Sequence, residues 1–109
     1  VILFNELKGR VDLLFVTAPT LMELWEGALK SAVSEKEKLK IGTFISSVPV
    51  LSFDINCAKK AAEVRVSIKD NPLELIDVMI AAIALAHGET LVTKDGHFVR
   101  IPGLTVLKY

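Results

Sequence analysis

The apolar residues of this chain follow two periods, one typical of strands and one typical of helices. Four short apolar runs predict strands, at residues 13–16, 48–53, 90–93 and 104–107. Other segments have helical spacing and predict helices, at residues 20–30, 34–47, 55–68 and 72–87. Strands that alternate with helices predict an α/β fold in which helices cover both faces of a parallel sheet.

Particular residues mark the ends of these helices. Asp54 is expected to cap the start of the third helix, and Ser34 and Glu37 have the spacing of a capping box at the start of the second. Pro72 is expected to open the fourth helix, and Gly88 is expected to end it.

Length and composition limit the overall organisation. A chain of 109 residues is expected to form one domain. Its hydrophobic content of 51% and mean hydropathy of +0.47 are high for a small monomer, so we expect part of the apolar surface to lie in a homodimer or another protein interface. The longest uninterrupted apolar segment, residues 78–86, is far shorter than the ~20 residues that span a bilayer, and no membrane attachment is expected.

Charge and cysteine usage narrow the function classes further. The formal net charge is zero, so any contact with nucleic acid is expected to be local and assisted by a metal. The single cysteine, Cys57, offers no disulfide framework and no cysteine cluster for a metal, and no signal peptide is recognisable. These features favour the reducing cytoplasm.

Two acidic residues stand out against their apolar surroundings. Asp77 is the only charge within residues 75–86, near the start of a helix that is apolar nearly all round, and a carboxylate in such a place needs a reason. Asp95 follows the next predicted strand, and ligands of parallel sheets bind beyond the carboxyl ends of strands. Two simpler interpretations stand beside this one: Asp77 serves only the helix dipole, and Asp95 forms only a turn with Gly96.

Glu23 is a third candidate, on the first predicted helix. Its helical neighbours Thr20 and Gly27 are small, and this spacing predicts a shallow notch beside the carboxylate. An ordinary surface glutamate is the alternative. Glu26 is different, because an ion pair with Lys30 one turn later explains it.

A shared cation would account for these acids. Carboxylates that meet at one point repel one another unless a cation neutralises them, and oxygen ligands favour Mg²⁺ or Mn²⁺ over zinc. Such an ion binds substrate phosphates and activates water. Glu23, Asp77 and Asp95 therefore predict metal-dependent hydrolysis of nucleic acid, whereas Asp54 is left outside the site because its capping role explains it.

The same residues lie in segments that resemble the PIN-domain ribonucleases, and in particular the VapC toxins of VapBC toxin–antitoxin systems. The specific part of the resemblance is DVMIAAIALAHG at residues 77–88, TLVTKDGHF at 90–98 and IPGL at 101–104. TLMELWEG at residues 20–27 is similar to the family segment that carries a glutamate, and the order of elements agrees over essentially the whole chain.

The resemblance implies a three-layer α/β/α sandwich with a central parallel sheet, a Mg²⁺- or Mn²⁺-dependent endoribonuclease, a homodimer and a VapB-type antitoxin partner. It makes Glu23, Asp77 and Asp95 the metal-binding acids, and Thr93 the hydroxyl residue that orients water beside them. PIN domains open with a central strand that ends in an aspartate. Residues 1–4 are similar to the stretch that follows this strand, so we expect a PIN-like domain over residues 1–109 whose first strand and aspartate lie upstream.

Several basic residues are candidates for contacting the RNA. His97 occupies a position where the family often has an acid, and would contact substrate or modulate the metal, unless it only makes a local hydrogen bond. Lys94 and Arg100 flank the acids, and Lys8 and Arg10 lie near the start of the chain. Each of these four would contact phosphate, or would be a solvated surface charge.

Two other functions are compatible with parts of this pattern. A catalytically inactive PIN scaffold that binds protein or RNA is the main alternative, because of the missing aspartate and the high apolar content. A receiver-type phosphoacceptor domain shares the α/β alternation. It would need an early acidic pair and an aspartate after a central strand, and the sequence offers neither.

Overall fold

The structure, a computed structural model, describes residues 14–108. The chain divides into two compact units, the first ending at Leu51 and the second beginning at Ser52. Each unit is described by itself below.

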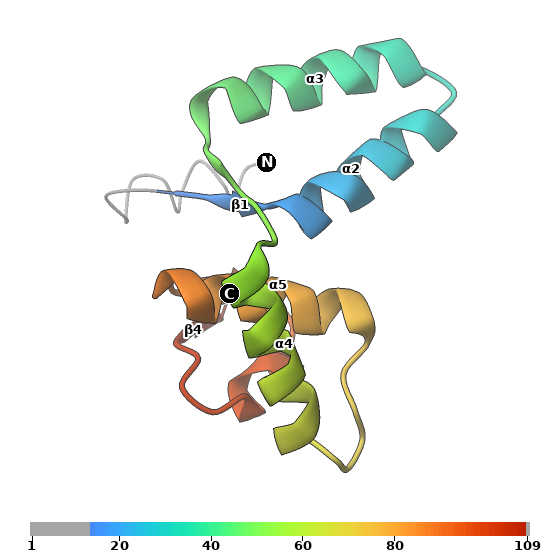
Figure 1. Cartoon of the computed structure of the whole chain (residues 1–109). Helices are drawn as coiled ribbons and strands as arrows, with labels where there is room; N and C mark the ends of the chain where they lie inside the picture. The colour runs from blue at the N-terminus through green and yellow to red at the C-terminus, as the bar shows by residue number, and fades with distance from the viewer. Residues whose placement is uncertain (1–13, 109) are drawn as a thin grey trace. The chain divides into compact units, whose positions relative to one another are not determined.

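The first unit is a helical hairpin joined to a pair of short strands (Figure 1). Its elements are β1 (Val16–Thr17), α2 (Ala18–Lys30), α3 (Ser34–Ser47) and β2 (Val50–Leu51). The two strands are parallel, with Val16 opposite Val50. Helices α2 and α3 pack against each other, and many of their large apolar side chains are exposed, among them Met22, Leu24, Trp25, Leu29 and Leu39.

The two helices of the first unit begin in different ways. Thr17 caps α2, because its hydroxyl accepts a hydrogen bond from the Thr20 amide at 3.3 Å. The capping box predicted at Ser34 and Glu37 is wrong. The capping position of α3 belongs to Val33, one residue earlier than a capping box requires, and Ser34 is already helical, so its hydroxyl has no cap hydrogen bond.

The second unit contains the apolar helix and the second pair of strands. Its elements are α4 (Ile55–Ser67), α5 (Leu75–His87), β3 (Leu91–Thr93), the 3₁₀ helix η1 (Gly96–Arg100) and β4 (Val106–Lys108). Strands β3 and β4 are parallel, with Leu91 opposite Val106. Helix α5 packs closely against α4 (Figure 1), and the core around this contact comprises Ala61, Val64, Val78, Ala81, Ala82, Phe98 and Ile101.

The ends of α5 confirm one prediction and correct another. Gly88 ends the helix in the left-handed region, with φ of 65°, and its amide donates to the last carbonyl groups of the helix. Pro72 does not open the helix, because the capping position is Glu74 and residues 70–74 form a loop. The reason is a distant contact: the Arg100 guanidinium donates to the carbonyl oxygens of Asp70 and Asn71 and holds this loop outside the helix.

The predicted alternation of helices with parallel strands is confirmed within both units. The strands are shorter than the apolar runs that predicted them, since each contains only two or three paired residues. Among residues 14–108, no helix is both long and apolar enough to cross a membrane.

Candidate metal centre

Asp77 lies in the first turn of α5 and is partly buried. Burial raises the pKa of its carboxyl group above the usual value, and the negative charges of Asp95 and Glu74 raise it further. His97 acts in the opposite direction and lowers the pKa of Asp77. Interactions of this kind act over short distances, so the start of α5 and the segment after β3 bring Asp77, Glu74, Asp95 and His97 to one place.

Asp95 connects β3 to η1 and is held by its neighbours. Its Oδ1 accepts a hydrogen bond from the His97 amide at 2.8 Å, which caps η1, and lies 2.8 Å from the ring Nδ1 of His97. The Asp95 amide donates to the Thr93 hydroxyl at 3.1 Å. The turn predicted at Asp95 is compatible with a site there, because local bonds hold the carboxylate and its charge acts on Asp77.

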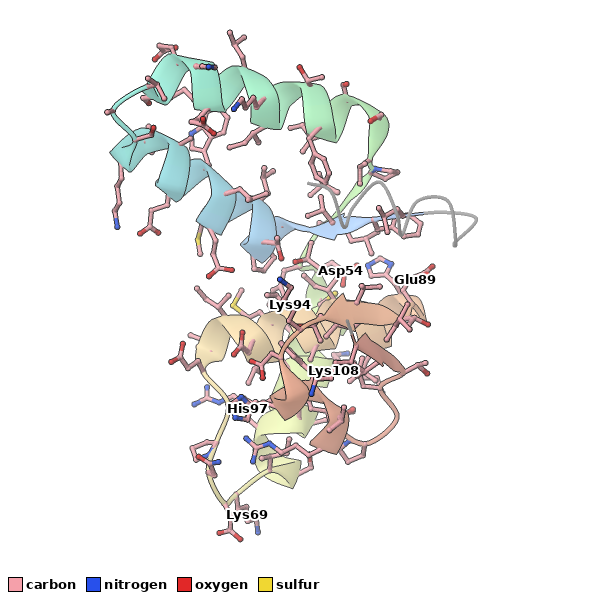
Figure 2. All side chains as sticks on the ribbon, turned by 180° about the vertical axis from the view of Figure 1, so that it is seen from behind. Asp54, Lys69, Glu89, Lys94, His97 and Lys108 are labelled. Carbon is pink, nitrogen blue, oxygen red and sulfur yellow. The ribbon has the colours of Figure 1, made fainter. Side chains whose placement is uncertain are left out.

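Two residues that sequence reasoning missed belong to this neighbourhood. Glu74 precedes Asp77 by three residues, a spacing that places side chains on one helix face and could have indicated it. Lys108 pairs in register with Thr93 across β3 and β4, and its Nζ lies so close to Gly96 that an added Cβ there would be 3.3 Å away. Figure 2 labels Lys108 and His97 on this part of the second unit. Only the strand pairing brings Lys108 here, so no local pattern could have indicated it.

The donor set suits a hard divalent cation. Asp77, Asp95 and Glu74 offer carboxylate oxygens, the ligands that Mg²⁺ and Mn²⁺ prefer. Burial first, and then the charges of Asp95 and Glu74, raise the pKa of Asp77, so its ionised form is disfavoured in the protein alone. A bound cation would favour the ionised form of Asp77, so the chemistry of these donors suits such an ion, and a shared site stays a prediction.

Glu23 lies on α2, in the first unit. A shallow hollow of about 220 Å³ lies beside it on the predicted Gly27 side, lined by Glu23, Glu26, Gly27 and Lys30 and without the predicted Thr20. The predicted ion pair is confirmed too, with Lys30 Nζ 2.9 Å from the Glu26 carboxylate. Participation of Glu23 in the same metal site as Asp77 and Asp95 stays a prediction.

The basic residues named from the sequence have different surroundings. The Arg100 guanidinium is engaged with the carbonyl groups of the loop at residues 70–71, which gives it a structural role besides the predicted phosphate contact. Lys94 directly precedes Asp95. Lys8 and Arg10 lie outside the described residues, as does the stretch at residues 1–4.

Comparison with known proteins gives a consistent set of relatives. A match to the PIN domain family covers residues 2–104. The tRNA(fMet)-specific endonuclease VapC of Salmonella typhimurium is 35% identical over 94 residues, which cover 84% of this chain and 71% of that protein. Ribonuclease VapC2 of Rickettsia felis is 30% identical over 102 residues, 91% of this chain and 76% of that protein.

Solved structures agree with these relatives. The DNA-bound VapBC structure from Salmonella typhimurium has a TM-score of 0.88 at 29% identity, covering 97% of this chain and 83% of that chain. VapBC2 from Rickettsia felis, bound to a DNA fragment from its promoter, has a TM-score of 0.83 at 28% identity, covering 97% of this chain and 84% of that chain. The predicted PIN-like α/β fold is thereby confirmed.

Proposed function

Because the chain belongs to the PIN domain family, we propose that it is a metal-dependent endoribonuclease that acts as the toxin of a toxin–antitoxin pair. Two relatives with ribonuclease names support the reaction, and similar structures of VapBC complexes support the toxin role. The main alternative, an inactive scaffold, accounts less well for a partly buried carboxylate whose pKa is raised by burial and by two neighbouring acids.

One observation carries the proposal: Asp77 and Asp95 lie close enough for the charge of one to raise the pKa of the other. Two carboxylates from separate elements are brought together at a cost in electrostatic repulsion, and Glu74 adds to it. Folding without a metal does not offset this repulsion, whereas binding of Mg²⁺ or Mn²⁺ would. In this proposal Asp77, Asp95 and Glu23 hold the ion, and Glu74 adds negative charge beside it.

When bound, the ion would polarise the scissile phosphate and lower the pKa of an attacking water. The side chains around it have separate tasks. Thr93 holds the Asp95 backbone through the 3.1 Å hydrogen bond, and it is also the hydroxyl proposed to orient water. His97 uses Nδ1 on Asp95, which leaves its Nε2 as the ring atom for the RNA. Lys94, Arg100 and Lys108 are proposed to contact RNA phosphates, the sequence-independent part of nucleic-acid binding.

The proposed partners are a VapB-type antitoxin and a second copy of the chain. Two solved structures that resemble this chain are of VapBC, which supports an antitoxin partner. The exposed apolar side chains of α2 and α3, which include Trp25 and Leu29, offer surface suited to a protein interface. We place the protein in the cytoplasm, where its RNA substrates would be.

Cleavage of defined RNAs tests the proposed activity. The complete encoded protein is incubated with end-labelled RNAs in Mg²⁺, Mn²⁺ or EDTA, and initiator transfer RNA is included because of the name of one relative. We expect cleavage with either metal and none in EDTA. Asp77→Asn and Asp95→Asn should each lower the rate at least about a hundredfold, as expected when a charged group that acts in the transition state is lost. Glu63→Gln, the same charge change in an exposed ion pair on α4, is the matched control and should leave the rate unchanged.

Other outcomes have clear meanings. Undiminished cleavage by both aspartate variants would refute the assignment of the site. No cleavage of any RNA, together with no binding of Mn²⁺ at millimolar concentration, would instead identify the protein as a non-catalytic PIN scaffold.

A further inference from the structure

A second group of potential metal ligands lies in the second unit, where the start of α4 meets the end of α5. A carboxylate oxygen of Asp54, the Sγ of Cys57 and a ring nitrogen of His87 all lie within 4.8 Å of one another. Asp54 is the residue before α4, and Cys57 lies in the first turn of that helix. His87 is the last residue of α5. In Figure 2 Asp54 lies at the opposite end of α4 from Lys69.

The local structure fixes two of these three groups. Asp54 caps α4, because its Oδ1 accepts a hydrogen bond from the Cys57 amide at 3.0 Å. Hydrogen bonds from the backbone and side chain of Cys57 lower the pKa of Asp54, so the carboxylate is ionised and offers negative charge to a cation. The Cys57 side chain is 0% exposed, and its Sγ donates to the Ser52 carbonyl at 3.6 Å, so the sulfur is held in place beside the cap.

We propose that Asp54, Cys57 and His87 form a binding site for a borderline-soft divalent cation of the Zn²⁺ type. One thiolate, one imidazole and one carboxylate are ligand types that zinc combines in tetrahedral sites, and a water would complete the coordination. With Zn–S of about 2.3 Å and Zn–N or Zn–O of about 2.0 Å, tetrahedral ligand atoms lie about 3.5 Å apart. The present ligand atoms lie within 4.8 Å of one another, and the exposed His87 is the ligand best able to move toward the other two when an ion binds.

The helix ends favour this ligand set. A thiolate at the start of α4 lies at the positive end of a helix dipole, and a cation held by His87 lies at the negative end of another. Burial raises the pKa of the Cys57 thiol, so in the metal-free protein the sulfur keeps its proton. Binding of the cation forms the metal–sulfur bond and releases that proton to solvent.

This site is separate from the acidic one. Asp77 and His87 lie at the two ends of α5, ten residues apart, which corresponds to about 15 Å along the helix axis. The donor sets also differ, because the acidic site offers oxygens whereas this one includes sulfur. A cation here would join the start of α4 to the end of α5, and would stabilise the second unit without supplying the ion for RNA cleavage.

Titration of the metal-free, reduced protein with Co²⁺ tests the proposal, since Co²⁺ replaces Zn²⁺ and reports its ligands by absorption. Among these 109 residues Cys57 is the one cysteine, so a thiolate-to-cobalt charge-transfer band in the near ultraviolet that is lost in Cys57→Ser comes from this side chain. We expect this band to saturate at one equivalent of Co²⁺ and to disappear when Zn²⁺ is added. Cys57→Ser should abolish it.

Two further variants keep the test independent of the buried cysteine. Asp54→Asn removes the charged ligand but retains a good capping residue, and His87→Gln changes an exposed side chain. Each should weaken Co²⁺ binding at least about tenfold. Glu63→Gln, the same kind of charge change in an exposed ion pair on α4, is the matched control and should leave the band and its affinity unchanged.

The absence of a charge-transfer band in the folded wild-type protein, checked by far-ultraviolet circular dichroism, would overturn the proposal. So would a band of unchanged affinity in both His87→Gln and Asp54→Asn, because cobalt would then bind Cys57 without the other two ligands.

Discussion

Replacing Asp77 by Asn should make the metal-free protein more stable while it removes the activity. The pKa of Asp77 is raised by burial and by the charges of Asp95 and Glu74, so its ionised form is disfavoured in the folded protein. Asparagine has a similar shape and no charge. Most substitutions destabilise a protein, so an increase in stability would be diagnostic of electrostatic strain at this position.

The expected size follows from two opposing effects. Repulsion between partly exposed like charges, screened by solvent and salt, contributes on the order of 1 kcal/mol. The variant also avoids burying an ionised carboxylate, which adds to its gain in stability. Loss of a negative charge from the first turn of α5 costs about 0.3–1 kcal/mol. We expect a net gain of about 0.5–1 kcal/mol, a rise in Tm of about 3–6 °C for a domain of this size.

The gain should depend on pH in a defined direction. A carboxyl group whose pKa is raised by folding contributes stability below its unfolded pKa and loses that contribution as pH rises through its folded pKa. The Asp77→Asn variant has no ionisable group at this position, so its stability does not fall in this way as pH rises. Its advantage should therefore be small near pH 3 and should grow with pH until Asp77 is fully ionised.

Thermal and urea unfolding in EDTA, measured from pH 3 to pH 8, checks this prediction, with Glu63→Gln as the control. In Mn²⁺ at a hundred times its Kd the order should reverse, because the wild type gains about 2.7 kcal/mol from binding and the variant does not. A lower stability of Asp77→Asn than of wild type in EDTA at pH 7 would refute the reasoning, as would an advantage that does not shrink at low pH.

Three further predictions concern the framework of the site. Gly88→Ala should lower the free energy of unfolding by about 1 kcal/mol, because φ is 65° there. Gly27→Ala lies in the interior of α2 with open space at the Cβ position and should raise it by about 0.5–1 kcal/mol, and urea unfolding of both variants measures the contrast. Arg100→Ala should cost about 0.5–1.5 kcal/mol and speed amide hydrogen exchange in the loop at residues 70–74, and unchanged exchange would mean that the guanidinium does not hold this loop. Ile83→Ala should cost about 2–5 kcal/mol in the same unfolding assay because this side chain is completely buried, and a cost below 1 kcal/mol would contradict its place in the core.

The features that sequence predicted well are those set by nearby residues. Asp54 caps a helix and Gly88 ends one because each interacts with backbone groups only a few residues away. Pro72 misled the prediction because the start of α5 depends on Arg100, which is distant in sequence. Long-range contacts of this kind leave no local pattern.

The candidate site shows the same division. Asp77 and Asp95 could be named from the sequence because each is an isolated charge beside an apolar run; the charge of Asp95 raises the pKa of Asp77, and their role as metal ligands stays a prediction. Lys108 reaches the site through pairing of β3 with β4, and Cys57 meets His87 only through packing of α4 on α5, so neither could be read from spacing along the chain.

The 3₁₀ helix η1 has a consequence for how this sequence can vary. Asp95 caps its first residue, and Arg100, its last, holds the loop that leads to Glu74 and Asp77. One five-residue element thus connects the acid after β3 with the approach to the acid on α5. An insertion or deletion within residues 96–100 would change both connections at once. Functional descendants of this chain should therefore vary in side chain along η1 but keep its length, and tolerate length changes in loops such as the one between α2 and α3.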